Sequence, residues 1–350
     1  MMKLEKLRWI RKITLRQVAA MCVMMVVIYF VAAPAGVNHE SDEVNMVGSM
    51  GYSYEDDSTE YEVHIVYALH ESGYLVKTEA RALSNMSEIE SIFTGIQEDS
   101  DRLQHNVDGL IPASAVLRDY VVYGDTVTLN LSESFLYYLT SIEEDLLASL
   151  VWSMTELSHI DRVHFQIEGE QVNNLNGGID VGRGLTRQMG INLEVGAPRV
   201  IDTQMMLLYF FTDDTADALL VPVTRLVAPE VDPFEYAVSS LVKGPIGASY
   251  ISVFNHRATL IEQPKLEDGI MTLNFCSELF FNQDQTQVSS QVIKQLVMTM
   301  TEFDDVHEVS VVIEGSSRVF DDAGNPITVP VGRNTVLGHE EGDDGFVKEY

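Results

Sequence analysis

One stretch of the chain occurs twice. Residues 150–169 read LVWSMTELSHIDRVHFQIEG, and residues 296–315 read LVMTMTEFDDVHEVSVVIEG. The offset is 146 residues without a gap, and nine of the twenty aligned positions are identical. Solenoid repeats have much shorter periods, about 20–50 residues. The pattern therefore predicts a duplicated domain.

The first half of each copy has the spacing of an amphipathic helix. Apolar residues recur at positions that share one stripe of a helix. They are Leu146, Leu147, Leu150, Val151, Met154 and Leu157 in the first copy and Val292, Ile293, Leu296, Val297, Met300 and Phe303 in the second. A partner-binding face is the alternative to a stripe packed on the domain's own sheet, and the packed stripe is favoured. Ser141 followed by Glu144 predicts a capping box at the start of the first helix.

The second half of each copy alternates apolar and polar residues, which is typical of a strand with one buried face. Upstream, residues 116–123 and 126–131 flank Gly124-Asp125 and predict a hairpin. Each repeat is expected to follow the order β-α-β-β-α-β. The predicted fold class is α+β, two tandem sandwiches with helices on one face of the sheet.

The charge of the chain limits its partners. The formal net charge is −31 over 350 residues, with a sequence pI of about 4.4. Nucleic-acid binding needs a basic patch, so this class of partner is not expected. The two cysteines, Cys22 and Cys276, do not form a disulfide framework.

The N-terminus has the pattern of a membrane segment. Residues 1–16 hold six basic residues against Glu5, and residues 18–35 hold no charged residue. A helix of that length spans about 27 Å, enough for the hydrocarbon core. Positive charges stay in the cytoplasm, so the remainder is expected outside it. An uncleaved anchor is favoured, while Ala33-Pro34-Ala35 leaves a cleaved signal peptide as the alternative.

These observations divide the chain into five parts. They are a basic segment and membrane anchor or signal peptide at 1–37, an acidic linker at 38–61, a first domain at 62–198, a second domain at 199–337 and an acidic tail at 338–350.

Two patterns in the sequence bear on catalysis and metal binding. Ser132-Glu133 and Ser277-Glu278 follow a predicted strand in each repeat and are compatible with a catalytic dyad. Turn chemistry after a strand is the favoured interpretation. The nine histidines are scattered without zinc spacing. We therefore assign no catalytic residue, no metal ligand and no cofactor.

Further matches connect the repeats outside the quoted stretch. Tyr209 matches Tyr67, and Arg225 lies in a run like that around Arg81. Val-Gly-Arg occurs at residues 181–183 and again at residues 331–333.

Together these motifs resemble the GerM family, whose members carry GerMN domains in tandem. The motifs are a tyrosine in the first strand, an arginine after an apolar pair, a helix ending Leu-x-x-Gly-Pro, Thr-Leu-Asn-Phe, and Leu-Val-x-x-x-Thr-Glu leading to Val-x-Ile-x-Gly. In this sequence they are Tyr209, Arg225, residues 241–245, residues 272–275, residues 296–302 and residues 309–315. The resemblance covers residues 62–196 and 204–334. The first repeat departs from it at Gly95-Ile96, where the family has Gly-Pro.

The resemblance implies an extracytoplasmic scaffold or assembly factor in endospore formation and germination, without enzymatic activity. It would be anchored in the cell membrane through residues 18–35 and lie between mother cell and forespore, beside the proteins of the channel complex. GerMN domains are similar to the ring-building modules of secretion systems, which implies a ring-building-motif-like fold and assembly into a homo-oligomer or ring. Family members are often lipoproteins, whereas Cys22 lacks a convincing lipobox.

Two interaction residues are proposed from the matches between repeats. Arg81 and Arg225 are candidates for contacting a partner, and salt bridges within the domain are an equal alternative for both. The alternative function is a protein that binds or processes peptidoglycan. It would require a paired-carboxylate or Ser/Cys-His constellation, or a rim of exposed aromatic residues.

Overall fold

The computed structural model describes residues 62–337, apart from 104–105, 198–202, 214, 216, 230, 248, 283, 285 and 328–329. The predicted membrane segment, the acidic linker and the acidic tail lie outside the described residues. Within the described part of the chain, no helix has the length and apolar character needed to cross a membrane.

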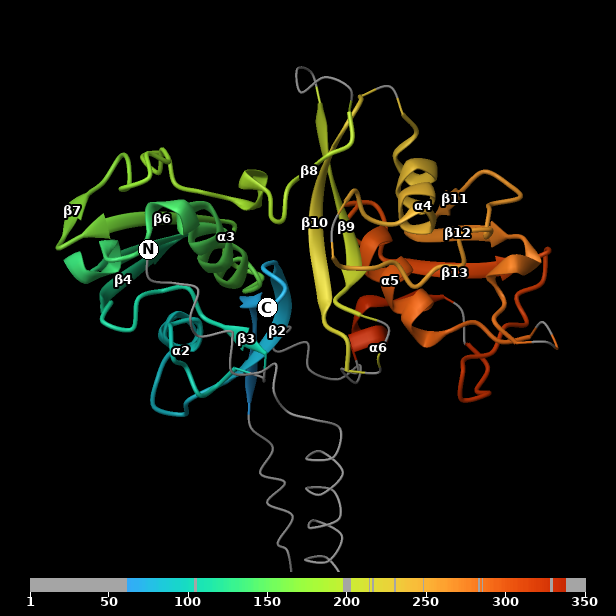
Figure 1. Ribbon diagram of the computed structural model, residues 1–350, viewed down its shortest axis with the longest axis horizontal. Helices are drawn as coiled ribbons and strands as arrows, with labels where there is room; N and C mark the ends of the chain where they lie inside the picture. Colours follow the sequence, from blue (N-terminus) through green and yellow to red (C-terminus); the bar gives the residue numbers. More distant parts are fainter. Residues whose placement is uncertain are drawn as a thin grey trace, which may run out of the picture. The chain divides into compact units, whose positions relative to one another are not determined.

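The first repeat contains two helices and two groups of strands (Figure 1). Its elements are β1 Val63–His70, β2 Leu75–Arg81, α2 Glu88–Gly95, β3 Val107–Asp108, β4 Leu117–Tyr123, β5 Thr126–Leu131, α3 Glu143–Met154, β6 Arg162–Ile167 and β7 Glu170–Gln171, followed by β8 Glu194–Val195 in the connector.

The second repeat has the same order of main elements, without a described counterpart of β3 and with an additional short helix at its end. Its elements are β9 Gln204–Phe211, β10 Leu220–Val227, α4 Pro233–Lys243, β11 Lys265–Glu267, β12 Ile270–Phe275, α5 Ser290–Met300, β13 Glu308–Ile313, β14 Val331–Gly332 and α6 Arg333–Leu337.

The quoted stretch forms the helix and strand of a β-α-β unit in each repeat. β5 and β6 are parallel, and β12 and β13 are parallel. Parallel neighbours need a crossover connection, which α3 and α5 supply. The predicted stripe is buried: Leu146, Leu147, Leu150, Val151 and Met154 are 0% exposed, and their counterparts in α5 are at most 5% exposed. The packed-stripe interpretation is therefore confirmed.

The predicted hairpin is confirmed as β4 and β5, whereas the capping box predicted at Ser141 is wrong. Residues Thr140–Ile142 form a 3₁₀ turn, and α3 begins after Ile142 without a side-chain cap. A capping box does occur at α2, where Ser87 and Glu90 bond reciprocally.

The predicted order of six elements omits β2 and β10, and also the two-residue strands β3, β7 and β14. In each repeat the first two strands form a hairpin outside the sheet of the β-α-β unit. The three sheets are β3-β1-β2-β10-β8 with β9 on β10, β4-β5-β6-β7, and β11-β12-β13-β14. The hairpins of the two repeats therefore meet in one mixed sheet, where Leu220 pairs with Lys77.

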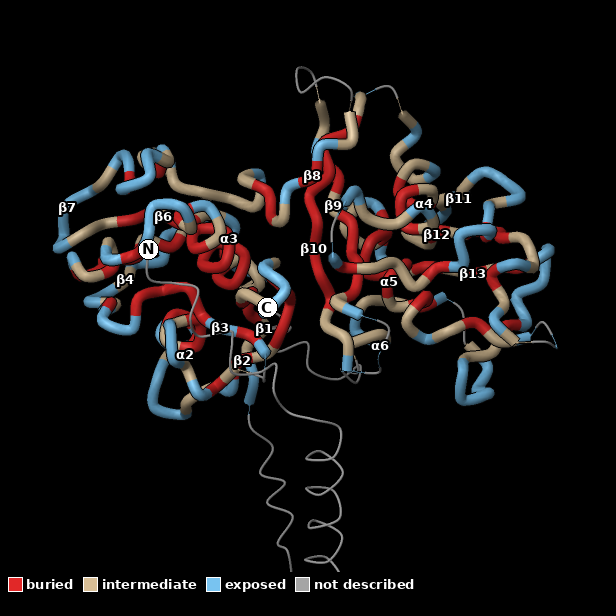
Figure 2. Tube along the Cα trace, viewed as in Figure 1, coloured by how far each residue is buried: buried red, intermediate tan, exposed pale blue. Residues whose placement is uncertain are grey.

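β10 lies at the centre of this arrangement and is buried along its whole length (Figure 2). Val221, Val223 and Val227 belong to the core of the second repeat, and that core also includes Ala68 and Val76 from the first hairpin. The two repeats therefore share apolar packing as well as a sheet.

Candidate functional site: a polar cluster that occurs twice

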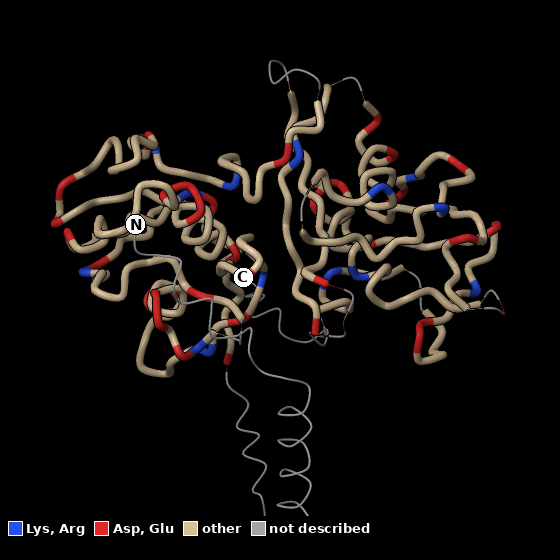
Figure 3. The backbone as a smooth tube through the Cα atoms, in the orientation of Figure 1, with Lys and Arg blue, Asp and Glu red and all other residues tan. Residues whose placement is uncertain are grey.

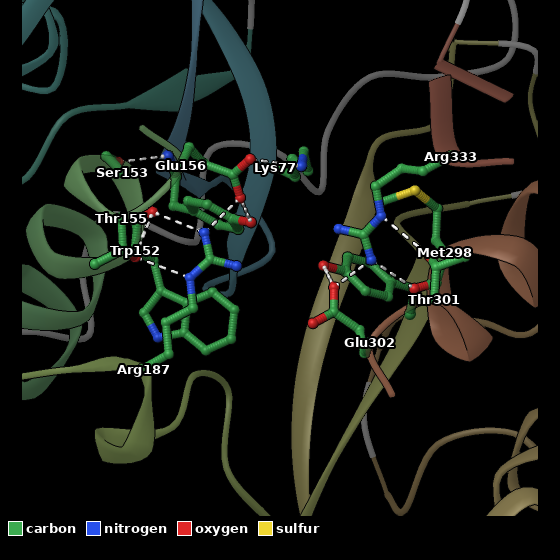
Figure 4. A network of polar contacts seen from close by, with 12 residues as sticks. Lys77, Trp152, Ser153, Thr155, Glu156, Arg187, Met298, Thr301, Glu302 and Arg333 are labelled. Carbon is green, nitrogen blue, oxygen red and sulfur yellow. Dashed lines mark hydrogen bonds and ion pairs between the residues drawn. The ribbon is translucent and has the colours of Figure 1, made fainter. Parts of the chain in front are cut away.

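Three side chains from distant parts of the first repeat meet in its interior (Figure 4). Tyr67 lies on β1. Glu156 follows the end of α3, and Arg187 lies in the connector after β7. The Tyr67 hydroxyl donates to Glu156 Oε1 at 2.6 Å, and Arg187 Nη2 donates to the same oxygen at 2.7 Å. We call this group the Tyr-Glu-Arg cluster.

The end of α3 fixes the arginine of the cluster. Arg187 Nε donates to Thr155 Oγ1 at 2.8 Å, and its Nη2 lies 3.4 Å from the carbonyl oxygen of Trp152. The guanidinium also lies 4.7 Å from the centre of the Trp152 ring. Arginine suits this position because its planar fork serves several acceptors at once.

The second repeat contains the same cluster with the same atoms. Tyr209 donates to Glu302 Oε1 at 2.8 Å, and Arg333 Nη2 donates to that oxygen at 2.5 Å. Arg333 Nε donates to Thr301 Oγ1 at 3.1 Å, and its Nη2 donates to the Met298 carbonyl at 3.1 Å. In both copies the arginine therefore bonds the helix end and the carboxylate together.

The helix also bonds to the backbone of each cluster tyrosine. In the first repeat, Tyr67 N donates to Ser153 Oγ at 2.9 Å, and Ser149 Oγ donates to Tyr67 O at 2.5 Å. In the second, Tyr209 N donates to Thr299 Oγ1 at 3.1 Å, and Gln295 Nε2 donates to Tyr209 O at 2.9 Å. In each repeat, hydrogen bonds thus connect a strand of the mixed sheet (β1 or β9) to the helix of the β-α-β unit (α3 or α5).

The first cluster holds one more charge than the second. Lys77 on β2 donates to Glu156 Oε2 at 3.0 Å, and its side chain is 5% exposed. Burial alone would raise the pKa of Glu156, but the charges of Lys77 and Arg187 outweigh it and lower that pKa to about 2. Burial, with the Glu156 charge beside it, raises the pKa of the Tyr67 hydroxyl well above 10. At neutral pH, Tyr67 is therefore neutral and Glu156 is negatively charged.

The sequence already held a signal for the missed arginine. Its Val-Gly-Arg match pairs Arg333 with Arg183, but the structure places Arg187 at the equivalent position. Val163 pairs with Leu185, just as Val309 pairs with Val331. The offset of 146 residues therefore continues from the quoted stretch to Arg187 and Arg333, and the Val-Gly-Arg match is wrong.

Arg225, one of the two proposed interaction residues, is buried in an ion pair. Its Nε and Nη2 donate to Glu194 Oε2 at 2.8 and 2.5 Å, and its side chain is 4% exposed. Glu194 Oε1 accepts from the Tyr250 hydroxyl at 2.6 Å and from Ile246 N at 3.0 Å. The structure thus shows a salt bridge, one of the two roles considered for Arg225.

Arg81, the other proposed interaction residue, is exposed. It is not the structural counterpart of Arg225, because the sequence match between the repeats is displaced by one residue. In the hairpins Tyr67 and Tyr209 are equivalent, and three positions before them His64 pairs with Ala80 while Met206 pairs with Arg225. The counterpart of Arg225 is therefore Ala80. Arg81 is the next residue, at the end of β2, where it is exposed.

A second buried arginine was not predicted. Arg102 donates from Nη1 to the Arg81 carbonyl at 3.0 Å and from Nη2 to the Ser91 carbonyl and Thr94 Oγ1, both at 2.6 Å. Burial lowers its pKa. It bonds to α2, as Arg225 bonds through Nη2 to the Gly244 carbonyl at the end of α4, at 3.2 Å. Arg102 and Arg225 come from different elements, so a comparison of the two repeats along the sequence did not predict the role of Arg102.

The two Ser-Glu pairs are not structural equivalents. Glu133 N donates to Glu168 and Ser277 N to Glu314, so Ser277 corresponds to Glu133 rather than to Ser132. Ser132 Oγ accepts from Val116 N at 2.9 Å and lies 2.7 Å from Ser134 Oγ. These contacts use the serine in a turn. Among the described residues, no group of three or more His, Cys, Asp or Glu side chains could hold a metal ion.

Comparison with known proteins identifies the family. A family model described as "Germane: Sporulation and spore germination" matches residues 52–173 and 207–319. The spore germination protein GerM of Bacillus subtilis (strain 168) is 30% identical over 240 residues, which are 67% of this chain and 66%, just under two thirds, of that protein.

A solved structure supports the same assignment. The tandem GerMN domains of the sporulation protein GerM from Bacillus subtilis match with a TM-score of 0.71 at 26% identity, over 78% of this chain and 98% of that structure. The family model matches more than half of the 350 residues. The chain therefore belongs to the Germane family of sporulation and spore germination proteins, and its described part has the mixed α+β fold of tandem GerMN domains.

Proposed function

We propose that this chain is a non-enzymatic, extracytoplasmic scaffold in endospore formation and germination, associated with the channel complex between mother cell and forespore. The observation that carries the proposal is the doubled Tyr-Glu-Arg cluster. Its tyrosine, carboxylate and guanidinium bond to one another and to the helix end in both copies. Groups used in this way stabilise two similar domains, whose outer surfaces are then available to neighbouring proteins.

The extracytoplasmic location in this proposal is inferred from the sequence. A basic N-terminus precedes eighteen uncharged residues, and the rest of the chain is strongly acidic. Similarity to a spore germination protein supports the proposed role in endospore formation and germination. Arg81 remains our candidate among the two arginines for contacting a partner, because its side chain is exposed whereas that of Arg225 is buried.

Capture of partners tests the scaffold role. The full chain would be crosslinked in sporulating cells of its own host at the engulfment stage, and the captured proteins identified by mass spectrometry. We expect envelope proteins of the channel complex, and fewer of them with Arg81→Glu at equal abundance of the chain. Recovery of the chain without envelope partners would contradict the proposal.

The alternative function is binding or processing of peptidoglycan. The purified chain would be incubated with purified peptidoglycan, then sedimented and assayed for released muropeptides. Under the scaffold proposal the chain stays in the supernatant and releases nothing. Cosedimentation or release would favour the cell-wall function instead.

A further inference from the structure

We infer that the outer edge of β4 is a docking site for an extended, apolar segment of another protein that carries basic residues at its ends. The inference deepens the scaffold role proposed above and rests on it. The site is formed by Leu117–Tyr123, at the end of the sheet β4-β5-β6-β7.

The outer edge of β4 has backbone N–H and C=O groups that no described strand pairs with. Its strand neighbour is β5 on one side, and no other strand or isolated bridge pairs with Leu117–Tyr123 in the part of the chain that the structure describes. The register of β4 shifts between Leu117 and Asp119, and from Asp119 to Tyr123 it is regular. Over this regular part the edge presents a row of N–H and C=O groups, which an added strand can bond.

The side chains at the C-terminal end of this edge are apolar and exposed, whereas Arg118 and Asp119 near its start are charged. Val121 is 61% exposed, Val122 38% and Tyr123 87%. Val122 pairs with the buried Val127 and shares its face of the sheet, so Val121 and Tyr123 lie on the opposite face. An added strand would therefore find apolar contacts on both faces.

The second repeat provides an internal comparison. Its edge strand β11 has three residues, and the paired registers make Lys265 equivalent to Val121 and Glu267 equivalent to Tyr123. Lys265 is also bonded to Glu262 at 2.8 Å. Charged residues on a short edge prevent unwanted strand pairing. The second repeat thus has charged residues at these positions of its edge, whereas residues 121–123 of the first repeat leave the corresponding positions apolar.

The charges around β4 select the occupant. The exposed Asp119 lies in the strand, and the exposed Asp125, Glu133 and Glu168 lie near it, while its one basic residue, Arg118, is paired with Glu168 at 2.6 Å. The predominance of Asp and Glu over Lys and Arg extends over the described chain (Figure 3). A second copy would bring like charge to this edge, so a segment with basic ends is the complementary partner.

A synthetic peptide tests the inference. The probe is Ac-KKTVTVYVTKK-amide with a fluorescent label, titrated against the full chain in detergent. We expect anisotropy to report binding, and hydrogen exchange to show slower exchange of the amides of residues 117–123. The same peptide with glutamate in place of lysine, or with proline at its central valine, is expected to bind at least tenfold more weakly.

The matched variant transfers the charges of the second repeat to the first. Val121→Lys with Tyr123→Glu places residues that β11 already tolerates at this register, and thermal unfolding checks that the fold is retained. We expect at least tenfold weaker binding of the lysine peptide. Glu267→Lys on the second edge is the control and is expected to leave binding unchanged.

Several results would overturn the inference. They are no binding to the unaltered chain, equal binding to the double variant, or equal binding of the glutamate peptide. Sedimentation of the chain alone as a dimer that the double variant dissolves would make a second copy the occupant, which also overturns it.

The role of the edge in sporulation is a separate readout. If the double variant loses the peptide but its host forms spores as the unaltered strain does, the edge does not serve sporulation, while a defect in the deletion strain would still support the proposed function. If deletion has no effect, the proposed function fails, and the peptide result stands as a property of the edge.

Discussion

Glu156 receives hydrogen bonds from three other elements: the Tyr67 hydroxyl, Lys77 and Arg187. Removing the carboxylate would leave two cations in a mostly buried site without their counter-charge. Breaking a buried ion pair by removing one partner costs about 3–5 kcal/mol. Removal of this single carboxylate would therefore cost a large share of the roughly 5–15 kcal/mol that separates the folded and unfolded states of a domain.

The lowered pKa of Glu156 predicts how stability depends on pH. Its folded pKa is about 2, against an ordinary value of 4.5. A depressed carboxyl pKa stabilises the fold above the unfolded pKa, and this contribution is lost as the pH falls from about 4.5 towards 2. The shift corresponds to about 3 kcal/mol at neutral pH.

We therefore expect urea unfolding of the chain to show a steep loss of stability below pH 4.5, and Glu156→Gln to be less stable at pH 7 with a flatter profile in that range. Tyr67→Phe is the control, because it retains the carboxylate and loses one hydrogen bond worth about 1–2 kcal/mol. A variant as steep as the unaltered chain would mean that Glu156 does not carry the acid sensitivity.

Asn192 connects elements of the two repeats. Its Oδ1 accepts from Leu75 N at 3.0 Å, and its Nδ2 donates to the carbonyls of Leu75 and Pro222, both at 2.7 Å. Its φ of +46° lies in the left-handed region, which asparagine tolerates better than most residues. One side chain thus completes the pairing between β2 and β10, where a single residue pair joins the strands.

Asn192→Ala is expected to weaken the joint sheet. Three backbone groups would lose their partner, at a cost of about 2–3 kcal/mol, and the alanine would add strain at positive φ. Asn192→Gly separates the two effects because glycine accepts this backbone conformation. Hydrogen exchange at Leu75 should accelerate in both variants; protection unchanged in Asn192→Gly would show that the side chain does not hold the strands together.

The β-α-β unit of each repeat depends on the helix stripe. Met300 is the last residue of α5, is 0% exposed and packs in the core of the second repeat. Met300→Asp would bury a carboxylate without a partner, which costs several kcal/mol. We expect the second repeat to lose its cooperative thermal transition, whereas Glu267→Lys on the exposed edge leaves the transition in place. An unchanged transition in Met300→Asp would contradict the packing described for α5.

At the scale of elements, the sequence predicted what is local. The hairpin around Gly124-Asp125 and the stripe of α3 follow from turn chemistry and helical period. The partner of a strand is not local, so the separation of β1 and β2 into another sheet was missed. The one-residue slips at Arg81 and Ser277 appear only from the strand register: Arg81 follows Ala80, the counterpart of Arg225, and Ser277 lies two residues after its strand whereas Ser132 lies one residue after its own.

At the scale of the whole molecule, much of the polar cluster was within reach of the sequence. The Tyr67 match and the Thr-Glu of the quoted stretch supply its tyrosine and carboxylate. Arg187 lies 31 residues beyond Glu156, and only the continued offset pointed to it. Arg102 and Glu194 had no signal, because each comes from a segment that the two repeats do not share.

The full chain also carries a prediction of topology. Residues after position 37 are expected outside the cytoplasm, because a basic segment precedes the uncharged stretch. Protease added to host cells without their wall should remove the bulk of the chain. Full protection of the chain, with a known external protein digested as control, would place the two repeats on the wrong side.

We propose that the two structural repeats serve sporulation through their surfaces and without catalysis. The most direct measurement is the count of heat-resistant spores in a deletion strain complemented with the unaltered gene or with Ser132→Ala and Ser277→Ala together. We expect deletion to lower the count and both genes to restore it equally. A double-serine protein that is folded and normally abundant yet fails to restore spores, or a deletion without any effect, would contradict the account.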